Sequence, residues 1–254
     1  MVRRHALIRR LPAVETLGSA TAICSDKTGT LTQNQMTVQE VCAGGRCYEF
    51  SGAGYVPEGD ISLENSVIVP KQHGVLSECL RAGLLCNDSR LIHSEGKWRI
   101  EGDPTEAALL SAALKSGLSS DSSEQDYPRV DTLPFESQHQ YMATLHRTAS
   151  ETHGVIYLKG SVESILSRCQ DTLNDGEEST PLDQTLVYQQ VQEMAVRGLR
   201  VLAFARKIPD APTLSVSHAD VKEGLTFLGL QAMMDPPRQE AITAVRACQQ
   251  AGVQ

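Results

Sequence analysis

Short apolar runs along the chain predict a set of β-strands. A compact run at 20–25 suits a buried strand that ends at Asp26. Apolar residues alternate on either side of Gly44-Gly45, which predicts a hairpin with a glycine turn. Further strands are predicted at 141–146, 155–158, 200–206 and 225–234. The segment 51–70 is rich in Gly, Pro and Ser, so it is predicted to be a loop.

Helices are predicted from apolar spacing and from capping residues. Leucines recur at positions 76, 80 and 84, which indicates a helix that ends near Cys86. A second helix begins at Asp103-Pro104, because Asp is a good N-cap and Pro suits the first helical position. Glu106 follows at the third position, where it can close a capping box. A third helix is predicted at 239–250, whereas the polar run 117–126 is predicted to be a surface loop.

The order of these elements divides the chain into two units. Both ends of the chain contribute to a unit with a buried strand, and residues 38–227 form a long insertion rich in hairpins. Asp235-Pro236-Pro237 ends the last strand and restricts the direction in which the chain leaves the insertion. The predicted fold class combines an α/β unit with an α+β insertion.

Composition narrows the functional classes. The 254 residues carry a formal net charge of -8, and phosphate-driven nucleic-acid binding needs a basic surface instead. No run approaches the ~18 apolar residues that span a bilayer, so a soluble chain is expected. The seven cysteines are odd in number and contain no C-x-x-C pair, which predicts reduced thiols in an intracellular compartment. Cysteines and histidines alike are assigned to packing or to the surface.

The motif with the clearest chemistry is DKTGTLT at 26–32, directly after the first predicted strand. Open α/β sheets bind ligands at the carboxyl ends of their strands. There the Asp26 carboxylate can attack phosphorus and form an aspartyl phosphate. Backbone N–H and hydroxyl groups of Thr28, Gly29 and Thr30 can surround the phosphoryl oxygens. A plain turn is the alternative, but a seven-residue match arises by chance only about 20 to the power -7 times per start position.

This motif resembles the phosphorylation motif of P-type ion-transporting ATPases, and the resemblance recurs through nearly the whole chain. The further blocks that carry it are CND at 86–88, GDPTE at 102–106, PFES at 134–137, KGSVE at 159–163, RGLR at 197–200 and MDPPR at 234–238. The combination is most similar to the calcium-pump branch. The resemblance implies a partial haloacid-dehalogenase-like Rossmannoid phosphorylation domain at 1–37 and 228–254. It also implies an inserted nucleotide-binding domain at 38–227, built on an antiparallel sheet with flanking helices.

By this resemblance, Asp26 accepts the γ-phosphoryl group of ATP, and Lys27, Thr28, Gly29 and Thr30 complete the catalytic loop. Mg²⁺ would be held by the Asp26 carboxylate and the Thr28 carbonyl, with a third ligand outside this chain. Phosphatases of the haloacid dehalogenase superfamily carry an acid/base Asp at the position of Thr28. Losing that base should lengthen the life of the acyl phosphate.

The resemblance also implies a nucleotide site formed by Glu106, Phe135, Lys159, Gly160 and Arg200. Phe135 would stack on adenine, the alternative being a core phenylalanine. Lys159, which Gly160 follows, would meet the nucleotide; the alternative is a solvated lysine. Arg200 would meet phosphates or is a surface arginine, and the capping box alone would explain Glu106.

One position departs from the family pattern. The family usually has a basic residue after Phe-x-Ser, whereas this chain continues with Gln138-His139-Gln140. We therefore expect modest ATP affinity.

The implied function is that of an ATP-driven cation pump, with calcium as the leading ion. Two alternatives are a soluble phosphatase of the same superfamily and a non-catalytic nucleotide-binding module. In the family, the remaining Mg ligands, the actuator domain and the membrane helices that bind the cation lie outside this segment. The chain is therefore expected to be a soluble, monomeric fragment from the cytoplasmic side of a membrane protein. It should bind ATP but turn it over poorly, because Mg coordination and the neutralisation of transition-state charge are incomplete.

Overall fold

The computed structural model describes residues 19–94, 96–148 and 153–253 and divides into two compact units. One unit is Gln35–Met234, and the other combines the chain up to Asn34 with Asp235–Gln254. In the larger unit the chain enters along β1 (Thr37–Ala43) and leaves along β13 (Leu225–Met234). These two strands pair antiparallel, with Thr37 opposite Met234.

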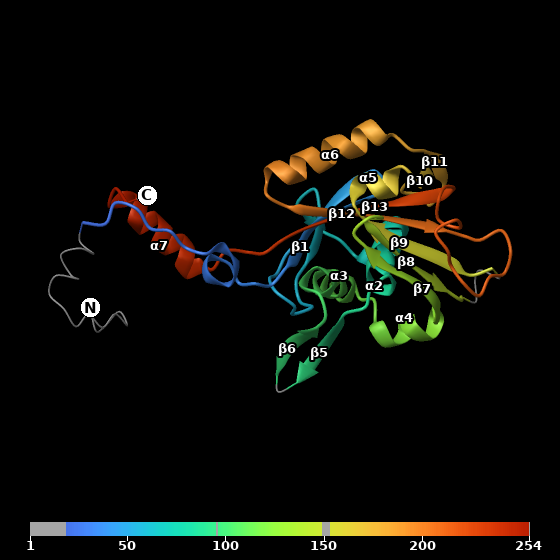
Figure 1. Cartoon of the computed structure of the whole chain (residues 1–254), viewed down its shortest axis with the longest axis horizontal. Coiled ribbons are helices and arrows are strands. Elements are labelled where there is room, and N and C mark those ends of the chain that lie inside the picture. Colours follow the sequence, from blue (N-terminus) through green and yellow to red (C-terminus); the bar gives the residue numbers. More distant parts are fainter. Residues whose placement is uncertain (1–18, 95, 149–152, 254) are drawn as a thin grey trace. The chain divides into compact units, whose positions relative to one another are not determined.

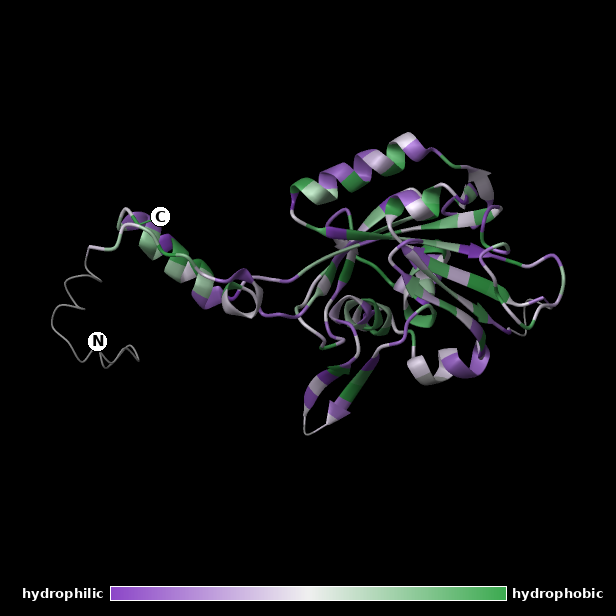
Figure 2. Cartoon of the chain, in the orientation of Figure 1, coloured by the Kyte–Doolittle hydropathy of each residue, from purple (hydrophilic) through white to green (hydrophobic). Residues whose placement is uncertain are grey.

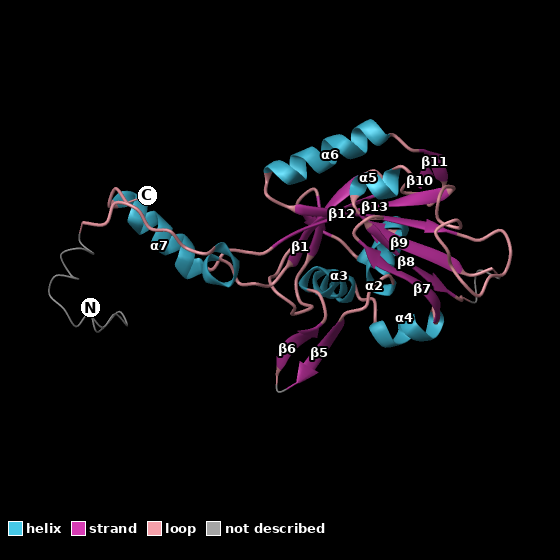
Figure 3. Ribbon diagram, viewed as in Figure 1, coloured by secondary structure: helices cyan, strands magenta, loops and turns pink. Residues whose placement is uncertain are grey.

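The larger unit is built on one sheet, which has 11 strands among the described residues. Its main path runs β4-β3-β2-β1-β13-β12-β9-β8-β7, and each neighbouring pair in it is antiparallel (Figures 1 and 3). The other strands of this path are β2 (Arg46–Phe50), β3 (Ile61–Leu63), β4 (Ser66–Val67), β7 (Arg129–Glu136), β8 (Tyr141–His146), β9 (Val155–Gly160) and β12 (Arg200–Lys207). Two strands lie off the path: β10 (Cys169–Leu173) pairs parallel with β13 and antiparallel with β11 (Ser179–Pro181). A separate hairpin joins β5 (Arg90–Ser94) to β6 (Lys97–Glu101).

Helices cover both faces of this sheet. On one face α2 (Gly74–Leu85) and α3 (Pro104–Lys115) share a buried apolar cluster with the strands, and on the other face α5 (Val162–Leu166) and α6 (Gln184–Val196) share a second. Alternate residues of β9 enter different clusters, as the two-residue period of a strand requires. Every position of β8 and β9 is therefore buried. Hydrophobic residues, green in Figure 2, recur along the strands of this sheet. The predicted antiparallel sheet with flanking helices is confirmed.

Several local predictions are confirmed. The Gly44-Gly45 hairpin forms between β1 and β2, α2 ends at Leu85, and β13 ends at Met234 before the prolines. In the smaller unit α7 spans Gln239–Gln250, as predicted.

Three local predictions are wrong. Residues 20–25 form no strand and are exposed, because no strand of the smaller unit's described residues lies beside them to pair with their backbone. The polar run 117–126 contains helix α4 (Ser120–Asp126), whose N-cap Ser119 accepts a hydrogen bond from the Ser122 N–H at 3.4 Å. The segment 51–70 is not loop throughout, since β3 and β4 extend the sheet there.

The described helices include none that could cross a membrane, because none combines sufficient length with sufficient apolar character.

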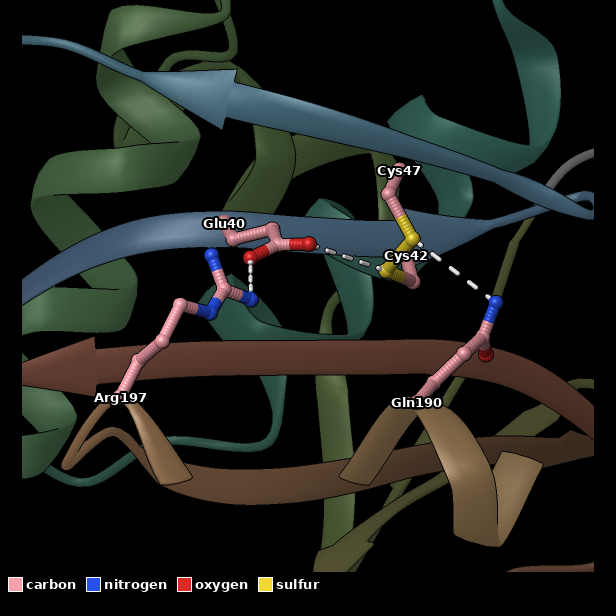
Figure 4. The surroundings of a disulfide bond; sticks show 5 residues. All are labelled: Glu40, Cys42, Cys47, Gln190 and Arg197. Carbon is pink, nitrogen blue, oxygen red and sulfur yellow. Dashed lines mark hydrogen bonds and ion pairs between the residues drawn. A yellow bond between two sulfur atoms is a disulfide. The ribbon is translucent and has the colours of Figure 1, made fainter. Parts of the chain in front are cut away.

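A disulfide bond joins Cys42 and Cys47 across the β1–β2 hairpin (Figure 4). Gly44 and Gly45 both have positive φ angles, 62° and 78°, as a two-residue type I′ turn requires. That turn places Ala43 opposite Arg46 and Cys42 opposite Cys47, so the two sulfur atoms meet. The prediction of reduced thiols is wrong for this pair. The signal in the sequence was the five-residue spacing of two cysteines around a Gly-Gly turn.

Reducing this disulfide should lower the free energy of unfolding by about 2 kcal/mol, because the bond closes a short loop in the unfolded chain. For a domain of this size the melting temperature should fall by roughly 4–8 °C. Differential scanning calorimetry with and without dithiothreitol measures the effect. The Cys42→Ser/Cys47→Ser variant is the control and should not respond to the reductant. An unchanged melting temperature, with both thiols shown to be free, would contradict the prediction.

Candidate functional site

The DKTGTLT motif, the predicted phosphorylation motif, forms a tight turn at Lys27–Leu31, with Asp26 immediately before it. Thr28 has φ -78° and ψ 123°, and Gly29 has φ 75° and ψ -12°, which are the angles of a type II turn. The second of these conformations strongly favours glycine. Thr32 closes the segment, because its N–H donates to the Lys27 carbonyl at 3.1 Å.

The 234–238 block is hydrogen-bonded to this turn although more than 200 residues separate the two in sequence. Thr32 Oγ1 donates to an Asp235 carboxylate oxygen at 2.5 Å and accepts the Gly29 N–H at 3.2 Å. The Arg238 guanidinium donates to the Thr32 carbonyl at 2.9 Å and to the Gly29 carbonyl at 3.2 Å. The Asp-Pro-Pro-Arg sequence therefore does more than end β13: its two charged residues brace the turn that follows Asp26.

The Asp26 side chain is exposed and makes no capping hydrogen bond to the turn. Asp26 was predicted to follow a buried strand, and that part of the prediction is wrong, because 20–25 is an exposed coil. The two candidate Mg²⁺ ligands on this segment are the Asp26 carboxylate and the Thr28 carbonyl. Both are hard oxygen donors, which Mg²⁺ prefers, so the chemistry of the donor set fits the ion.

In the larger unit, the sheet brings the nucleotide-site candidates to one end. Strands β7 and β9 run in the same direction, since each is antiparallel to β8, and β12 runs opposite to β9. Phe135 near the end of β7, Lys159 and Gly160 at the end of β9, and Arg200 at the start of β12 therefore share one edge of the sheet. Neighbouring strands are about 4.8 Å apart, so β7 and β9 are roughly 10 Å apart.

Lys159 forms a largely buried ion pair with Glu106 of α3. Only 9% of the Lys159 side chain and 18% of the Glu106 side chain are exposed. The lysine points to the α2–α3 face of the sheet, the face to which Val155 and Tyr157 of β9 contribute. The alternative prediction of a solvated lysine is wrong.

Glu106 does not close the predicted capping box. Asp103 caps α3 through Oδ1, but its own N–H donates to Ser89 Oγ at 2.8 Å and not to Glu106. Glu106 Oε2 instead accepts from Ser89 Oγ at 2.9 Å and from the Asp88 N–H at 3.1 Å. The Glu106 carboxylate is thus held between the segment that follows α2 and the Lys159 ammonium.

Asn87 and Arg129 organise this segment. Asn87 Nδ2 donates to main-chain carbonyls of α2 and α3, both at 3.0 Å. The Arg129 guanidinium donates to the Leu85 carbonyl at 2.8 Å and pairs with Asp88 at 2.7 Å. A cation at the C-terminus of α2 also complements the helix dipole. Sequence reasoning missed Arg129, because nothing around it in the chain indicates that it reaches the end of a distant helix.

The remaining candidates differ in exposure. Phe135 is 60% exposed, so the alternative prediction of a core phenylalanine is wrong. Arg200 is exposed, and its guanidinium lies 3.4 Å from Thr105 Oγ1, one residue before Glu106. Gly160 packs so closely on the adjacent strand that a Cβ atom there would lie 2.4 Å from the Gln140 carbonyl oxygen. Any larger residue at position 160 would displace β8.

A cavity of about 800 Å³ lies in this unit beside β5 and α4, and none of the five nucleotide-site candidates lines it. Its walls include Asp88, Arg90, Arg129 and His146. Asp88 and Ser89, which also line the cavity, are the residues that hydrogen-bond to Glu106, so the cavity adjoins the candidate site without including it.

Known proteins are similar to this chain over all or most of its length. The family model described as "P-type ATPase, cytoplasmic domain N" matches residues 75–240. The "Cation-transporting ATPase pma1" of Synechocystis sp. is 51% identical over the whole of this chain, which covers 28% of that relative. The "Calcium-transporting ATPase" of Bacillus subtilis is 37% identical, again over all of this chain and 28% of the relative. The human "Calcium-transporting ATPase type 2C member 1" is 37% identical over 97% of this chain and 26% of its own length. The chain thus spans little more than a quarter of these relatives.

Proposed function

This chain belongs to the P-type ATPase family, and we propose that it binds ATP at the strand ends of the larger unit. We further propose that Asp26 accepts the γ-phosphoryl group and that the chain is part of an ATP-driven cation pump. The observation that carries the proposal is the convergence of Phe135, Lys159 and Arg200 at one edge of the sheet. An exposed aromatic ring at the same end of the sheet as two cationic side chains suits a ligand with a base at one end and phosphates at the other.

The nucleotide would be bound by groups with distinct tasks. Phe135 offers an exposed aromatic face on which adenine can stack. The Lys159 ammonium, held at its position by Glu106, offers its remaining N–H donors to an anionic or carbonyl group of the ligand. Arg200, beside Thr105, can donate to phosphate oxygens. This region is preferred to the 800 Å³ cavity because the candidate residues converge here.

In the phosphoryl-transfer step, an Asp26 carboxylate oxygen attacks the γ-phosphorus. The new bond is an acyl phosphate, the bond from the γ-phosphorus to the bridging oxygen breaks, and ADP leaves. Thr28 and Thr30 would donate to the phosphoryl oxygens from a turn that Thr32 and Arg238 hold rigid. Mg²⁺, when held by the Asp26 carboxylate and the Thr28 carbonyl, would neutralise charge on the transferred group.

The residue at position 28, a threonine, favours a pump over the main alternative, a phosphatase of the haloacid dehalogenase superfamily. A phosphatase needs a base near the acyl phosphate to activate water, and a threonine hydroxyl does not serve that role. A persistent phosphoenzyme suits a pump, in which its decay is coupled to ion movement. Hydrolysis of small phosphate esters by this chain, lost in Asp26→Asn, would favour the phosphatase instead.

Calcium is the transported ion that we propose, with the parent protein in a membrane and this segment on its cytoplasmic side. The support is the name of two relatives, the calcium-transporting ATPases of Bacillus subtilis and human, each 37% identical to this chain. The cation would meet the parent's membrane part and not the units described above.

ATP should raise the melting temperature of this chain, because a ligand that binds only the folded state stabilises it. At an ATP concentration 100-fold above Kd the gain is about 2.7 kcal/mol. Phe135→Ala should weaken ATP binding by roughly 5- to 150-fold, since base stacking contributes about 1–3 kcal/mol. Isothermal titration calorimetry and thermal shift measure both effects. Tyr188→Ala removes a partly exposed aromatic ring from α6 and is the matched control. Equal ATP affinity in all three proteins would refute the proposed site.

A further inference from the structure

We propose that Glu136, His139 and His218 form a binding site for a divalent transition metal, with Zn²⁺ as the best match. The carboxylate and the two imidazoles each offer one ligand atom, and these atoms all lie within 4.8 Å of one another. His139 Nε2 is 3.6 Å from Glu136 Oε2. Two ligands bound tetrahedrally at 2.0–2.1 Å from one Zn²⁺ are about 3.4 Å apart, so this pair is already near the required separation.

The chemistry of the three groups selects the class of metal. Imidazole nitrogens favour Zn²⁺ and its transition-metal neighbours, whereas Ca²⁺ and Mg²⁺ prefer sites made of oxygen atoms. Two histidines and one glutamate are a known zinc ligand set that leaves a coordination position for water. Glu136 and His218 are exposed and His139 is half-buried, so an ion can reach all three from solvent.

Two of the ligands lie on one well-braced turn. Glu136 ends β7, and its carbonyl accepts the N–H groups of His139 at 3.0 Å and Gln140 at 2.8 Å. The His139 carbonyl in turn accepts the Ser164 hydroxyl of α5 at 2.8 Å. The backbone of the turn is therefore fixed before any metal binds.

The third ligand comes from the connection between β12 and β13. His218 lies in a turn in which Asp220 accepts the Ser217 N–H at 2.8 Å and the Ser217 hydroxyl at 2.5 Å. The same connection is anchored to β7, because the Val216 N–H donates to Asp131 at 2.8 Å. Hydrogen bonds therefore fix the backbone of both segments that carry the proposed ligands, the β7–β8 turn and the β12–β13 connection.

Tyr141 supplies the kind of outer partner that metal-binding histidines usually have. Its hydroxyl is 2.6 Å from His218 Nδ1. If that nitrogen carries the proton, Nε2 presents its lone pair to the metal. The Arg168 guanidinium lies over the Tyr141 ring, 4.5 Å from its centroid, and helps to fix the ring in place.

Metal binding requires two small rearrangements. The His139 and His218 rings are in contact, with centroids 4.2 Å apart, and must open slightly to share one ion. The Gln138 amide nitrogen donates to Glu136 Oε2 at 2.8 Å and lies 3.3 Å from His139 Nε2, so it must move away from both ligand atoms. Both changes involve exposed or half-exposed side chains on a fixed backbone.

The bound ion would tie the β7–β8 turn to the β12–β13 connection. Phe135 directly precedes Glu136, so the metal would also restrict the backbone that carries this ring. The proposed metal site does not depend on the proposed ATP site, so measurements of metal binding alone test it.

The test is a titration of the tag-free chain with Zn²⁺ by calorimetry, repeated with Co²⁺ and followed by visible absorption. We expect a single Zn²⁺ equivalent, a Co²⁺ spectrum of nitrogen and oxygen ligation without thiolate bands, and no comparable binding of Ca²⁺ or Mg²⁺. His139→Ala and His218→Ala should each abolish the saturable signal. Tyr141→Phe should weaken binding about tenfold or more, as loss of an outer partner does. His93→Ala, on the β5–β6 hairpin, is the matched control.

Near-ultraviolet circular dichroism establishes that each variant is folded. Zn²⁺ should also raise the melting temperature of the wild type but not of His139→Ala. The proposal is overturned if the folded wild type binds no Zn²⁺, or if the His139→Ala/His218→Ala variant binds it with unchanged affinity. Thiolate bands in the Co²⁺ spectrum would likewise assign the metal to cysteines and overturn it.

Discussion

Replacing Lys159 by methionine should weaken ATP binding by roughly 10- to 100-fold and destabilise the larger unit at the same time. A hydrogen bond from a charged donor contributes about 1.5–3 kcal/mol, which sets the expected loss of affinity. The loss of stability has a separate cause. Methionine leaves the Glu106 carboxylate without its cation in a site where only 18% of that side chain is exposed. Breaking a buried pair in this way costs about 3–5 kcal/mol.

A second substitution separates the two effects. In Lys159→Met/Glu106→Gln the buried charges are both gone, and a neutral, well-packed replacement of an ion pair costs little. Urea denaturation should therefore show that most of the stability returns, while calorimetry should show that ATP affinity does not. Glu106→Gln alone keeps the ammonium and should retain more affinity than the double variant. If the double variant binds ATP as tightly as the wild type, Lys159 is a structural residue and not a nucleotide contact.

For the nucleotide-site candidates, the sequence could predict some positions along the strands but not the contacts of the side chains. Lys159 directly follows the predicted strand 155–158, so its position at a strand end could be predicted, whereas no strand was predicted for β7, which carries Phe135. The burial of Lys159 could not be predicted, because it depends on α3 crossing the same face of the sheet. Glu106 illustrates the same limit. Its capping-box spacing is real, yet Ser89, a residue of a distant segment, takes the Asp103 N–H that Glu106 would have accepted.

The Cys42–Cys47 disulfide was missed for a different reason. The glycine turn was predicted, and a two-residue turn fixes the register, so the pairing of positions 42 and 47 was within reach. The prediction of reduced thiols rested on the odd number of cysteines in the whole chain, and this count does not detect a pair that faces each other across one turn. At 20–25 the apolar run was readable, but a strand also needs a partner, and the described part of the smaller unit offers none. The roles of Asp26 and its loop remain predictions.

His146 carries the largest pH effect that we expect on stability. Its side chain is buried, with 1% exposed, at the end of β8. Burial and, to a smaller extent, the nearby Arg129 charge lower the pKa of His146 from its usual 6.5 to about 4, although the hydrogen bond to the Tyr127 carbonyl raises it. Nδ1 lies 2.9 Å from the Tyr127 carbonyl and Nε2 2.9 Å from Thr144 Oγ1. A neutral ring that donates from Nδ1 and accepts at Nε2 satisfies both contacts.

The free energy of unfolding should therefore fall by about 3 kcal/mol between pH 6.5 and pH 4 on account of this residue. The folded-state pKa is depressed, so in this window the unfolded chain binds a proton that the folded chain excludes. The stability is present above pH 6.5 and is lost as the pH falls toward 4. His146→Gln keeps a donor and an acceptor without a group that titrates, so its unfolding free energy should fall less over the same range. Urea denaturation of both proteins at half-unit pH steps gives the difference. Parallel pH profiles for wild type and variant would show that His146 is not the group responsible.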